Sequence, residues 1–394
     1  MAAVADDETL SLIDLATSQE DGRAWVITDD ADRPVAYLLI DVVDGNAHVE
    51  QVSVHPDHAR QSLGAALLDT AAAWAEQPRK ETTHNNQERT RSRPRYVSMS
   101  GSAGDGGMTR EVIASDGVRL RVYEAGQATG PTVLCVHGYP DDHTLWDGVT
   151  AELAQRYHVV SYDVRGAGES DKPRGRRAYR LDQLAQDLAA VVDAVSPSRP
   201  VHLLAHDWGA VQSWHAVTGE WLRGRVTSYT SISGPCLDHA GHWLRAQLRQ
   251  PTPRALRELI TQLMASWYVW FFQLPLLPEL TWRTGLPQRA IAALDRTSAP
   301  TMSDAVHGIQ LYRANMVPRL GRPGSRTTDV PVQVLAPQRD PFVSVALQTA
   351  ISQWVPNLTV RVLPGGHWLP RTHPEVVAHD TGELIERTEG GPHC

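Results

Sequence analysis

Asp207 is the residue whose surroundings are best suited to covalent chemistry. The apolar run Val201–Leu204 is typical of a buried strand, and the sequence AHDWG follows it over residues 205–209. Small residues two positions before and two positions after Asp207 meet the steric requirement of a nucleophile elbow, a sharp turn from strand to helix that usually carries serine. A carboxylate at this position predicts an anionic oxygen nucleophile. The alternative is an aspartate that caps the following helix.

Asp340 and His367 are suited to complete a catalytic triad with this nucleophile. Each follows an apolar run that predicts a strand, Val330–Leu335 before Asp340 and Leu358–Leu363 before His367. A histidine can remove a proton from water, and a carboxylate beside it orients the ring and stabilises its cation. Asp329 is a rival to Asp340, but it precedes its strand and therefore lies at the opposite end of the sheet.

The elements that must position these side chains alternate between strand and helix from Met108 onward. Such alternation predicts an α/β fold with a mostly parallel sheet, in which reactive groups gather at the carboxyl ends of the strands. The predicted strands are Val118–Glu124, Pro131–Val136, Tyr157–Tyr162, Val201–Leu204, Val226–Ser233, Val330–Leu335 and Leu358–Leu363. The predicted helices are Trp146–Gln155, Leu181–Val195, a segment through Trp214, and Pro374–Glu386.

The alternation stops between Gly234 and about Gly324, where helical segments, tryptophans and prolines dominate. This insertion is long enough to form a helical lid over the strand ends. Within it, Trp267–Trp282 is strongly apolar, but it is short for a transmembrane span of about 20 residues and contains Pro275 and Pro278. We expect this stretch to line a buried pocket, with contact to a membrane surface as the less favoured alternative.

Five features of residues 108–388 together resemble one known family. They are HGYP at 137–140, DVRGAGES at 163–170, HDWG at 206–209, Asp340 and His367. In this combination the chain resembles the epoxide hydrolase branch of the α/β-hydrolase superfamily, and within it the bacterial hydrolases that occur joined to a short-chain dehydrogenase domain. The resemblance implies an α/β-hydrolase fold with a helical cap domain, whose order of nucleophile, acid and histidine this sequence shares.

The resemblance also implies a two-step mechanism. An epoxide carbon is opened by in-line displacement, and the carboxylate of Asp207 can attack it directly to form an alkyl ester. His367, oriented by Asp340, would then activate the water that hydrolyses the ester and releases a vicinal diol. The backbone N–H groups of Tyr139 and Trp208 are the expected oxyanion-hole donors.

Two cap tyrosines, Tyr268 and Tyr312, match the proton donors that the resemblance implies for the oxygen set free by ring opening. Tyrosine is protonated at pH 7 and can donate a hydrogen bond or a proton. The alternative for each is an ordinary core tyrosine with a satisfied hydroxyl. The apolar cap predicts an aromatic or fatty-acid-like epoxide. The residues expected to contact it are Trp146, Trp267, Phe271, Phe272 and Trp368.

Three other functions compete with epoxide hydrolysis. A haloalkane or fluoroacetate dehalogenase also uses an aspartate nucleophile on this fold. The former typically carries asparagine where Tyr139 stands in this chain. The latter carries arginine beside the nucleophile, and no arginine adjoins Asp207 here. The second alternative is an acetyl-CoA-dependent acetyltransferase with an idle hydrolase domain, and the third is a fusion that only binds lipid-like ligands.

Residues 1–78 resemble part of a GNAT-type N-acetyltransferase. The predicted strands are Ala24–Thr28, Pro34–Val43 and Ala47–Val54. A loop and a helix start follow them, an arrangement suited to hold a pyrophosphate. The residues at the acetyl-CoA positions of the family motif Q-x-x-G-x-G/A are Gln61, Leu63, Gly64 and Ala65. Ala66 replaces the last glycine, and the strands that would finish the cleft have no counterpart, so we expect an incomplete unit without activity.

An abrupt change of composition follows Gln77. A charged, polar stretch and then a Ser/Gly-rich stretch predict a disordered linker over residues 79–107. We therefore expect a hydrolase core formed by residues 108–234 and 325–388, a cap over 235–324 and a short tail over 389–394.

Charge and composition argue against several broad classes. The 394 residues carry a net charge of −8 with a pI near 6.1, which argues against nucleic acid as a main partner. The three scattered cysteines fit neither a disulfide framework nor a zinc site. The acidic N-terminus lacks the pattern of a signal peptide. We therefore expect a cytoplasmic enzyme without metal or cofactor, acting on a small apolar epoxide and water.

Overall fold

The computed structural model describes residues 24–28, 34–43, 46–54, 108–295 and 300–390. The chain divides into two compact units, residues 1–90 and 91–394. The first contains the expected strands, paired antiparallel in the order β1-β2-β3. Their bounds are Ala24–Thr28, Pro34–Val43 and Asn46–Val54. The positions expected to bind acetyl-CoA and the expected linker over 79–107 lie outside the described residues.

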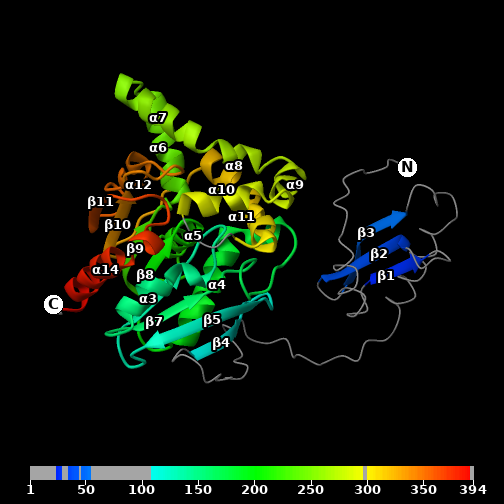
Figure 1. Ribbon diagram of the computed structural model, residues 1–394, viewed down its shortest axis with the longest axis horizontal. Helices are drawn as coiled ribbons and strands as arrows, with labels where there is room; N and C mark the ends of the chain where they lie inside the picture. The colour runs from blue at the N-terminus through cyan, green and yellow to red at the C-terminus, as the bar shows by residue number, and fades with distance from the viewer. Residues whose placement is uncertain (1–23, 29–33, 44–45, 55–107, 296–299, 391–394) are drawn as a thin grey trace. The chain divides into compact units, whose positions relative to one another are not determined.

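The second unit is built on an eight-stranded sheet in the order β11-β10-β9-β8-β6-β7-β5-β4 (Figure 1). Strands β6 to β11 run parallel, whereas β5 pairs antiparallel with both β4 and β7. This mostly parallel sheet confirms the expected fold class, although the apolar pattern does not predict β4. The strands are β4 Met108–Ile113, β5 Arg119–Gly126, β6 Thr132–Val136, β7 His158–Tyr162, β8 Val201–His206, β9 Val226–Ile232, β10 Val332–Pro337 and β11 Leu358–Leu363.

Helices cover both faces of the sheet, and each face has its own hydrophobic core. Helices α4 (Leu181–Val195) and α5 (Trp208–Val217) pack on one core, and α3 (Asp147–Leu153) and α14 (Pro374–Glu389) pack on the other. Alternate residues of β6 belong to the two cores, as the pleat of a strand requires. Strands covered on both faces account for the near-continuous apolar runs in the sequence.

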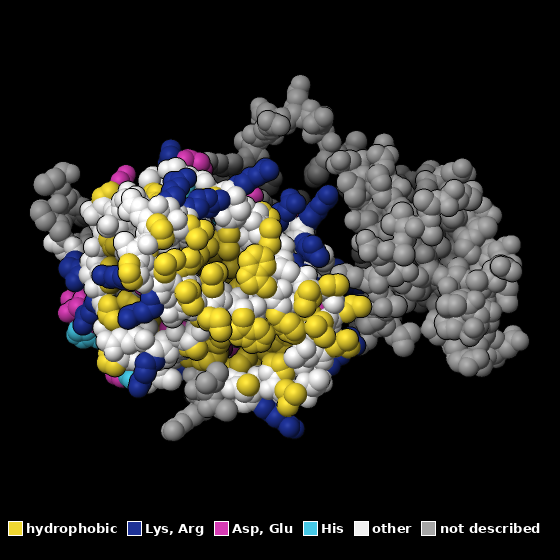
Figure 2. Space-filling view, turned by 90° about the horizontal axis from the view of Figure 1, so that it is seen from above, with side chains coloured by type: hydrophobic (Ala, Val, Ile, Leu, Met, Phe, Trp, Pro, Cys, Tyr) yellow, Lys and Arg dark blue, Asp and Glu magenta, His cyan; other side chains and the backbone are white. Residues whose placement is uncertain are grey.

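Helices α6 to α11 form a cap inserted between β9 and β10. They lie together on one side of the strands (Figure 1), and hydrophobic side chains gather on their outer face (Figure 2). In the part of the chain that the structure describes, no helix has the length and apolar character needed to cross a membrane. The cap helices are α6 Leu237–Arg249, α7 Pro253–Ala265, α8 Trp267–Phe271, α9 Leu277–Arg283, α10 Leu286–Asp295 and α11 Met302–Gly321.

Hydrogen bonds fasten α11 to the core at two places. The side-chain amide of Asn315 donates to the carbonyl of Tyr179 at 2.8 Å. Toward the start of the helix, the Asp304 carboxylate accepts the N–H of Gly168 at 3.0 Å. Tyr312 lies between these two anchors, so its position relative to the strand ends is fixed from both sides.

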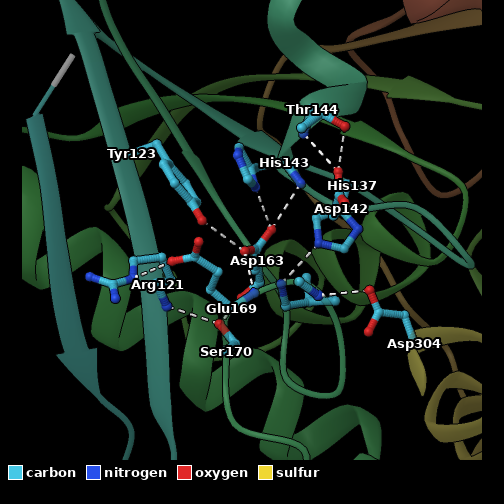
Figure 3. A network of polar contacts seen from close by, with 12 residues as sticks. Arg121, Tyr123, His137, Asp142, His143, Thr144, Asp163, Glu169, Ser170 and Asp304 are labelled. Carbon is cyan, nitrogen blue, oxygen red and sulfur yellow. Dashed lines mark hydrogen bonds and ion pairs between the residues drawn. The ribbon is translucent and has the colours of Figure 1, made fainter. Parts of the chain in front are cut away.

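Asp163 ties the loops at the strand ends together from a fully buried position (Figure 3). Its carboxylate accepts hydrogen bonds from the Tyr123 hydroxyl at 3.0 Å and the Glu169 N–H at 2.8 Å. It also accepts the backbone N–H of His143 at 2.9 Å and the ring N–H of that residue at 2.8 Å. Burial alone would raise the pKa of Asp163, but the hydrogen bond from His143 and the neighbouring charges and donors outweigh it and lower the pKa to about 2.

We expect Asp163→Asn to lower the free energy of unfolding by about 2 kcal/mol at neutral pH, because the ionised carboxylate is favoured in the folded state. A carboxyl pKa that is lowered by folding stabilises the protein fully above its ordinary value of 3.8, and this contribution is lost as the pH falls through about 2. Urea denaturation of both proteins over this pH range measures the difference.

The matched control is Glu220→Gln, which removes an exposed ion pair with Arg223 and should change stability by less than about 1 kcal/mol. A stability difference between wild type and Asp163→Asn that stayed constant down to pH 2 would contradict the charge-based explanation.

Candidate active site

Asp207 occupies a strained turn between β8 and α5. Its backbone φ of 51° and ψ of −122° lie in a region that non-glycine residues rarely adopt. A Cβ at Gly209 would overlap the carbonyl oxygens of Val136 and His137, and a Cβ at Gly234 would overlap the carbonyl oxygen of Asp207. The turn thus has the geometry of the predicted nucleophile elbow. Asp207 occupies the N-cap position of α5, but its side chain makes no capping hydrogen bond there.

The two carboxylate oxygens of Asp207 face different groups. Oδ1 accepts the backbone N–H of Tyr139 at 2.7 Å, and the neighbouring backbone N–H of Trp208 lowers the pKa of this carboxylate. Oδ2 lies 3.7 Å from Nε2 of His367. A Cβ at Gly138 would overlap Oδ1, so the glycine of HGYP allows this loop to approach the carboxylate. Of the two predicted oxyanion-hole donors, Tyr139 donates to Asp207, and Trp208 directly follows Asp207 in the chain.

His367 is held between two carboxylates. Its Nδ1 lies 3.0 Å from Oδ2 of Asp340, and its Nε2 faces Asp207. Since an ionised carboxylate only accepts, Nδ1 carries a proton toward Asp340. The other oxygen of Asp340 accepts the N–H groups of Phe342 at 2.8 Å and Val343 at 3.1 Å. All three predicted triad residues follow the carboxyl ends of parallel strands, as their sequence positions predict.

Burial and charge shift the titration of both facing groups. Burial raises the pKa of Asp207 to about 6, although the charge of His367 and the two backbone N–H groups oppose it. Burial would lower the pKa of His367, but the negative charge of Asp340 and its hydrogen bond outweigh this and raise the pKa to about 9. Near pH 7 the pair therefore consists of a carboxylate and an imidazolium.

Tyr268 on α8 and Tyr312 on α11 line the same cavity as Asp207 and His367. The two phenol rings pack edge to face with centroids 5.7 Å apart, and Tyr312 packs against Trp208 with centroids 4.9 Å apart. Burial raises the pKa of both tyrosines, and the charge of Asp207 raises both further. Both hydroxyls therefore stay protonated at neutral pH and can donate to an oxygen bound in the cavity.

The cavity has a volume of about 450 Å³ and a mostly apolar lining. A smaller cavity of about 120 Å³ shares Asp207, Tyr268, Tyr312 and Phe342 with it, so the carboxylate borders two spaces. The predicted substrate-contact residues that line the larger cavity are Trp267, Phe271, Phe272 and Trp368.

Trp146 does not line either cavity, which corrects its prediction as a substrate contact. It ends the 3-10 helix η2 (His143–Trp146) and is fully buried in the core that α3 and α14 cover. The stretch Trp267–Trp282 lines the larger cavity as expected, but part of it is also exposed to solvent. Trp267 and Trp270 are 64% and 60% exposed, because α8 presents one side to the cavity and the other to solvent.

Two buried residues beside the triad are not predicted from the sequence. Asp141 accepts the indole N–H of Trp368 at 3.0 Å and pairs with Arg371 at 3.0 Å. His206 donates from Nε2 to the backbone carbonyl of His367 at 2.9 Å, and burial holds its pKa well below the usual range, so the ring is neutral. Their positions directly after HGYP and directly before the nucleophile are the signals that could have indicated them.

A glycine of α11 allows the cap to approach the HGYP loop. A Cβ at Gly308 would overlap the ring of Tyr139, whose hydroxyl donates to the carbonyl of Ala305 at 2.9 Å. The Tyr139 ring also packs edge to face against Tyr312, with centroids 5.4 Å apart. The residue that supplies a backbone N–H to Asp207 is thus attached to the helix that carries Tyr312.

One group of side chains among the described residues has the spacing of metal ligands, namely His379, Asp380 and Glu383 on α14. Arg361 pairs with Asp380 at 2.6 Å and with Glu383 at 3.0 Å. None of these residues lines either cavity at Asp207, so the group is an ion-paired cluster outside the site.

Comparison with known proteins adds two family matches. A family model described as "alpha/beta hydrolase fold" matches residues 131–374, and one described as "Acetyltransferase (GNAT) family" matches residues 3–96. The chain is 38% identical over 297 residues to "Probable oxidoreductase EphD" of Mycobacterium tuberculosis, covering 71% of this chain and 50% of that protein. It is 26% identical over 294 residues to "Epoxide hydrolase 3" of Xenopus tropicalis, covering 67% and 74%. The chain thus spans half the length of the first relative.

Solved structures share the fold of the second unit. An epoxide hydrolase of Bacillus megaterium in complex with an inhibitor matches with a TM-score of 0.58 at 22% identity, covering 70% of this chain and 100% of that one. Epoxide hydrolase VrEH1 from Vigna radiata matches with a TM-score of 0.55 at 23% identity, covering 71% and 98%. At these identities the likeness establishes the fold alone.

Proposed function

This chain belongs to the α/β-hydrolase family, and we propose that it converts an epoxide into a vicinal diol. One observation carries the proposal: a carboxylate at the nucleophile elbow shares an apolar cavity with two tyrosines that stay protonated at neutral pH. A carboxylate can attack an sp³ carbon, and the phenols can protonate the oxygen that leaves it. The epoxide hydrolase names of several relatives agree with this chemistry.

In the first step, Oδ2 of Asp207 attacks a ring carbon of the epoxide, and the bond between that carbon and the epoxide oxygen breaks. Oδ2 suits this role because Oδ1 is engaged by the N–H of Tyr139. The electron pair of the broken bond stays on the epoxide oxygen, which takes a proton from Tyr268 or Tyr312. The product of this step is an ester between Asp207 and the substrate carbon.

In the second step, His367 removes a proton from a water, and the water oxygen attacks the ester carbonyl carbon. Formation of the ester has removed the negative charge of Asp207, one of the influences that raise the pKa of His367, so the imidazole is more readily neutral. Negative charge develops on Oδ1, which the N–H groups of Tyr139 and Trp208 stabilise, each by roughly 3 kcal/mol. The proton that the imidazolium of His367 gives up converts the tyrosinate back to tyrosine. The bond between the ester carbonyl carbon and the substrate oxygen then breaks, that oxygen takes the remaining proton of the attacking water, and the diol leaves the ionised Asp207. His367 keeps the proton that it took from the water, so the starting state is regenerated and the net reaction adds one water.

Residues 3–96 match the GNAT family, and we propose that they take no part in this reaction. The eight-stranded sheet begins at Met108, and the described residues that line the cavity at Asp207 all lie between Tyr139 and Trp368. The cavity's apolar lining supports an apolar epoxide as substrate.

We expect a His367→Gln variant mixed rapidly with styrene oxide to gain the mass of one epoxide on Asp207, because the ester forms but its hydrolysis lacks a base. Peptide mass spectrometry locates the adduct. Asp207→Ala should give no adduct and lose diol formation by roughly 10⁴-fold or more. Asp329→Asn is the matched control, since this exposed carboxyl precedes β10 and should leave activity unchanged. Release of halide from a haloalkane without any diol formation would overturn the proposal.

Replacing either cap tyrosine should slow ester formation more than ester hydrolysis, because the proton is donated during ring opening. We expect Tyr268→Phe and Tyr312→Phe each to slow single-turnover ester formation by about 10²-fold, and the double variant to slow it further. Stopped-flow fluorescence separates the two steps. Tyr157→Phe removes another buried hydroxyl, outside the cavity, and should change neither rate. Equal slowing of both steps by the cap variants would argue against a donor role.

The rate of ester formation should fall as the pH drops below about 6, because only the ionised form of Asp207 attacks. Burial raises this pKa, so the loss is expected at higher pH than for an ordinary aspartate, with a tenfold decrease for each further pH unit. Single-turnover rates measured between pH 5 and 8 test this, with circular dichroism at each pH to show that the protein stays folded. A rate that remains constant down to pH 5 would contradict the raised pKa.

A further inference from the structure

We propose that the outer face of the cap docks on the surface of an anionic lipid bilayer. This cap face is defined by the exposed apolar residues between Leu256 and Leu286. They make up eleven of the eighteen large hydrophobic residues that are exposed among the described residues. Monomeric soluble proteins rarely expose so continuous an apolar surface unless it meets a partner. Its members are Leu256, Ile260, Leu263, Met264, Trp267, Trp270, Leu274, Leu276, Leu277, Leu280 and Leu286.

The apolar residues of α7 follow helical spacing on the side turned away from the protein. Leu256, Ile260, Leu263 and Met264 recur at intervals of four, three and one residues, and Met264 is 71% exposed. Ala255 and Leu259, on the opposite side of this helix, are buried against the protein. Figure 2 shows that hydrophobic side chains form a broad area on this view, with Lys and Arg side chains around it. Helix α7 therefore has two apolar sides, one packed against the protein and one exposed to solvent.

Charge favours an anionic partner. Residues 235–324 contain ten arginines and five carboxylates, a net charge of +5, although the whole chain carries −8. Arg257, Arg283 and Arg289 are exposed, and none of them has an ion-pair partner among the described residues. A second copy of the chain is a poorer occupant, because two cap faces in contact would bring two positively charged surfaces together. Lipid headgroups that carry phosphate supply the opposite charge around an apolar interior.

The composition of the face is that of an interfacial surface. Trp267 and Trp270 project from α8, and tryptophan is enriched where membrane meets water. Helix α7 has 13 residues, too few to span a bilayer, so the contact is with one leaflet. An amphipathic helix with cationic residues beside its apolar side lies in the plane of such a surface.

The cavity at Asp207 opens on this same face. Trp267 and Leu286 line the cavity and are 64% and 63% exposed, so they form part of its mouth. Docking would place the mouth against the lipid. Given the proposed function, an apolar epoxide dissolved in the bilayer would then enter the cavity without crossing water.

The test is co-sedimentation of the full chain with vesicles of phosphatidylcholine alone and of phosphatidylcholine mixed with phosphatidylglycerol. We expect binding to the mixed vesicles that weakens as salt is added, and at least tenfold weaker binding to phosphatidylcholine. The variant Ile260→Glu with Met264→Glu should lose binding to the mixed vesicles. Neither residue lines the cavity, so turnover of water-soluble styrene oxide should be unchanged.

The matched control is Val360→Glu with Val362→Glu. It places two carboxylates at exposed apolar positions on β11, which belongs to the sheet and not to the cap, and it should leave vesicle binding intact. Wild-type protein that fails to bind the mixed vesicles would overturn the proposal. So would binding that survives Ile260→Glu with Met264→Glu, since another part of the chain would then be responsible. Self-association in analytical ultracentrifugation that this variant abolishes, without vesicle binding, would assign the face to a second copy. Vesicle binding needs no turnover, so it stands or falls separately from epoxide hydrolysis.

Discussion

A buried carboxylate that has to remain ionised is the constraint on which the site depends. Removing a charge from water is unfavourable unless hydrogen bonds and an opposite charge replace the solvent. At Asp207 the backbone N–H groups of Tyr139 and Trp208 and the ring of His367 replace it. Burial nevertheless raises the pKa of Asp207 to about 6, so these groups only partly offset the loss of solvent.

The sheet and the cap of the second unit contribute different groups to the site. Backbone donors, the imidazole and its supporting carboxylate come from loops at the ends of parallel strands, whose positions the sheet fixes. The phenols come from cap helices, which reach the core through hydrogen bonds at Asn315 and Asp304. In the proposed reaction, the epoxide oxygen would therefore take its proton from the phenols of the cap and not from residues at the strand ends.

The strand-end residues could be predicted from the sequence because their signals are local. A buried strand, a sharp turn and a helix start fall within a few residues of Asp207, and the same holds for His367 after β11. Trp146 could not be placed, because the side of a short helix that faces the cavity depends on packing against α14, more than two hundred residues later. The solvent exposure of Trp267 and Trp270 on α8 could not be predicted, because buried and exposed apolar residues of a helix look alike in sequence.

Gly308 lies one helical turn before Tyr312, and side chains four residues apart occupy the same side of a helix. Since a Cβ at 308 would overlap the Tyr139 ring, α11 can come this near to the loop only where one position lacks a methyl group. The absence of a Cβ at 308 therefore limits the distance between Tyr312 and Asp207. A bulkier residue there would push α11 away from the loop, so the size of the cavity and the distance from the Tyr312 phenol to the Asp207 carboxylate both depend on one position.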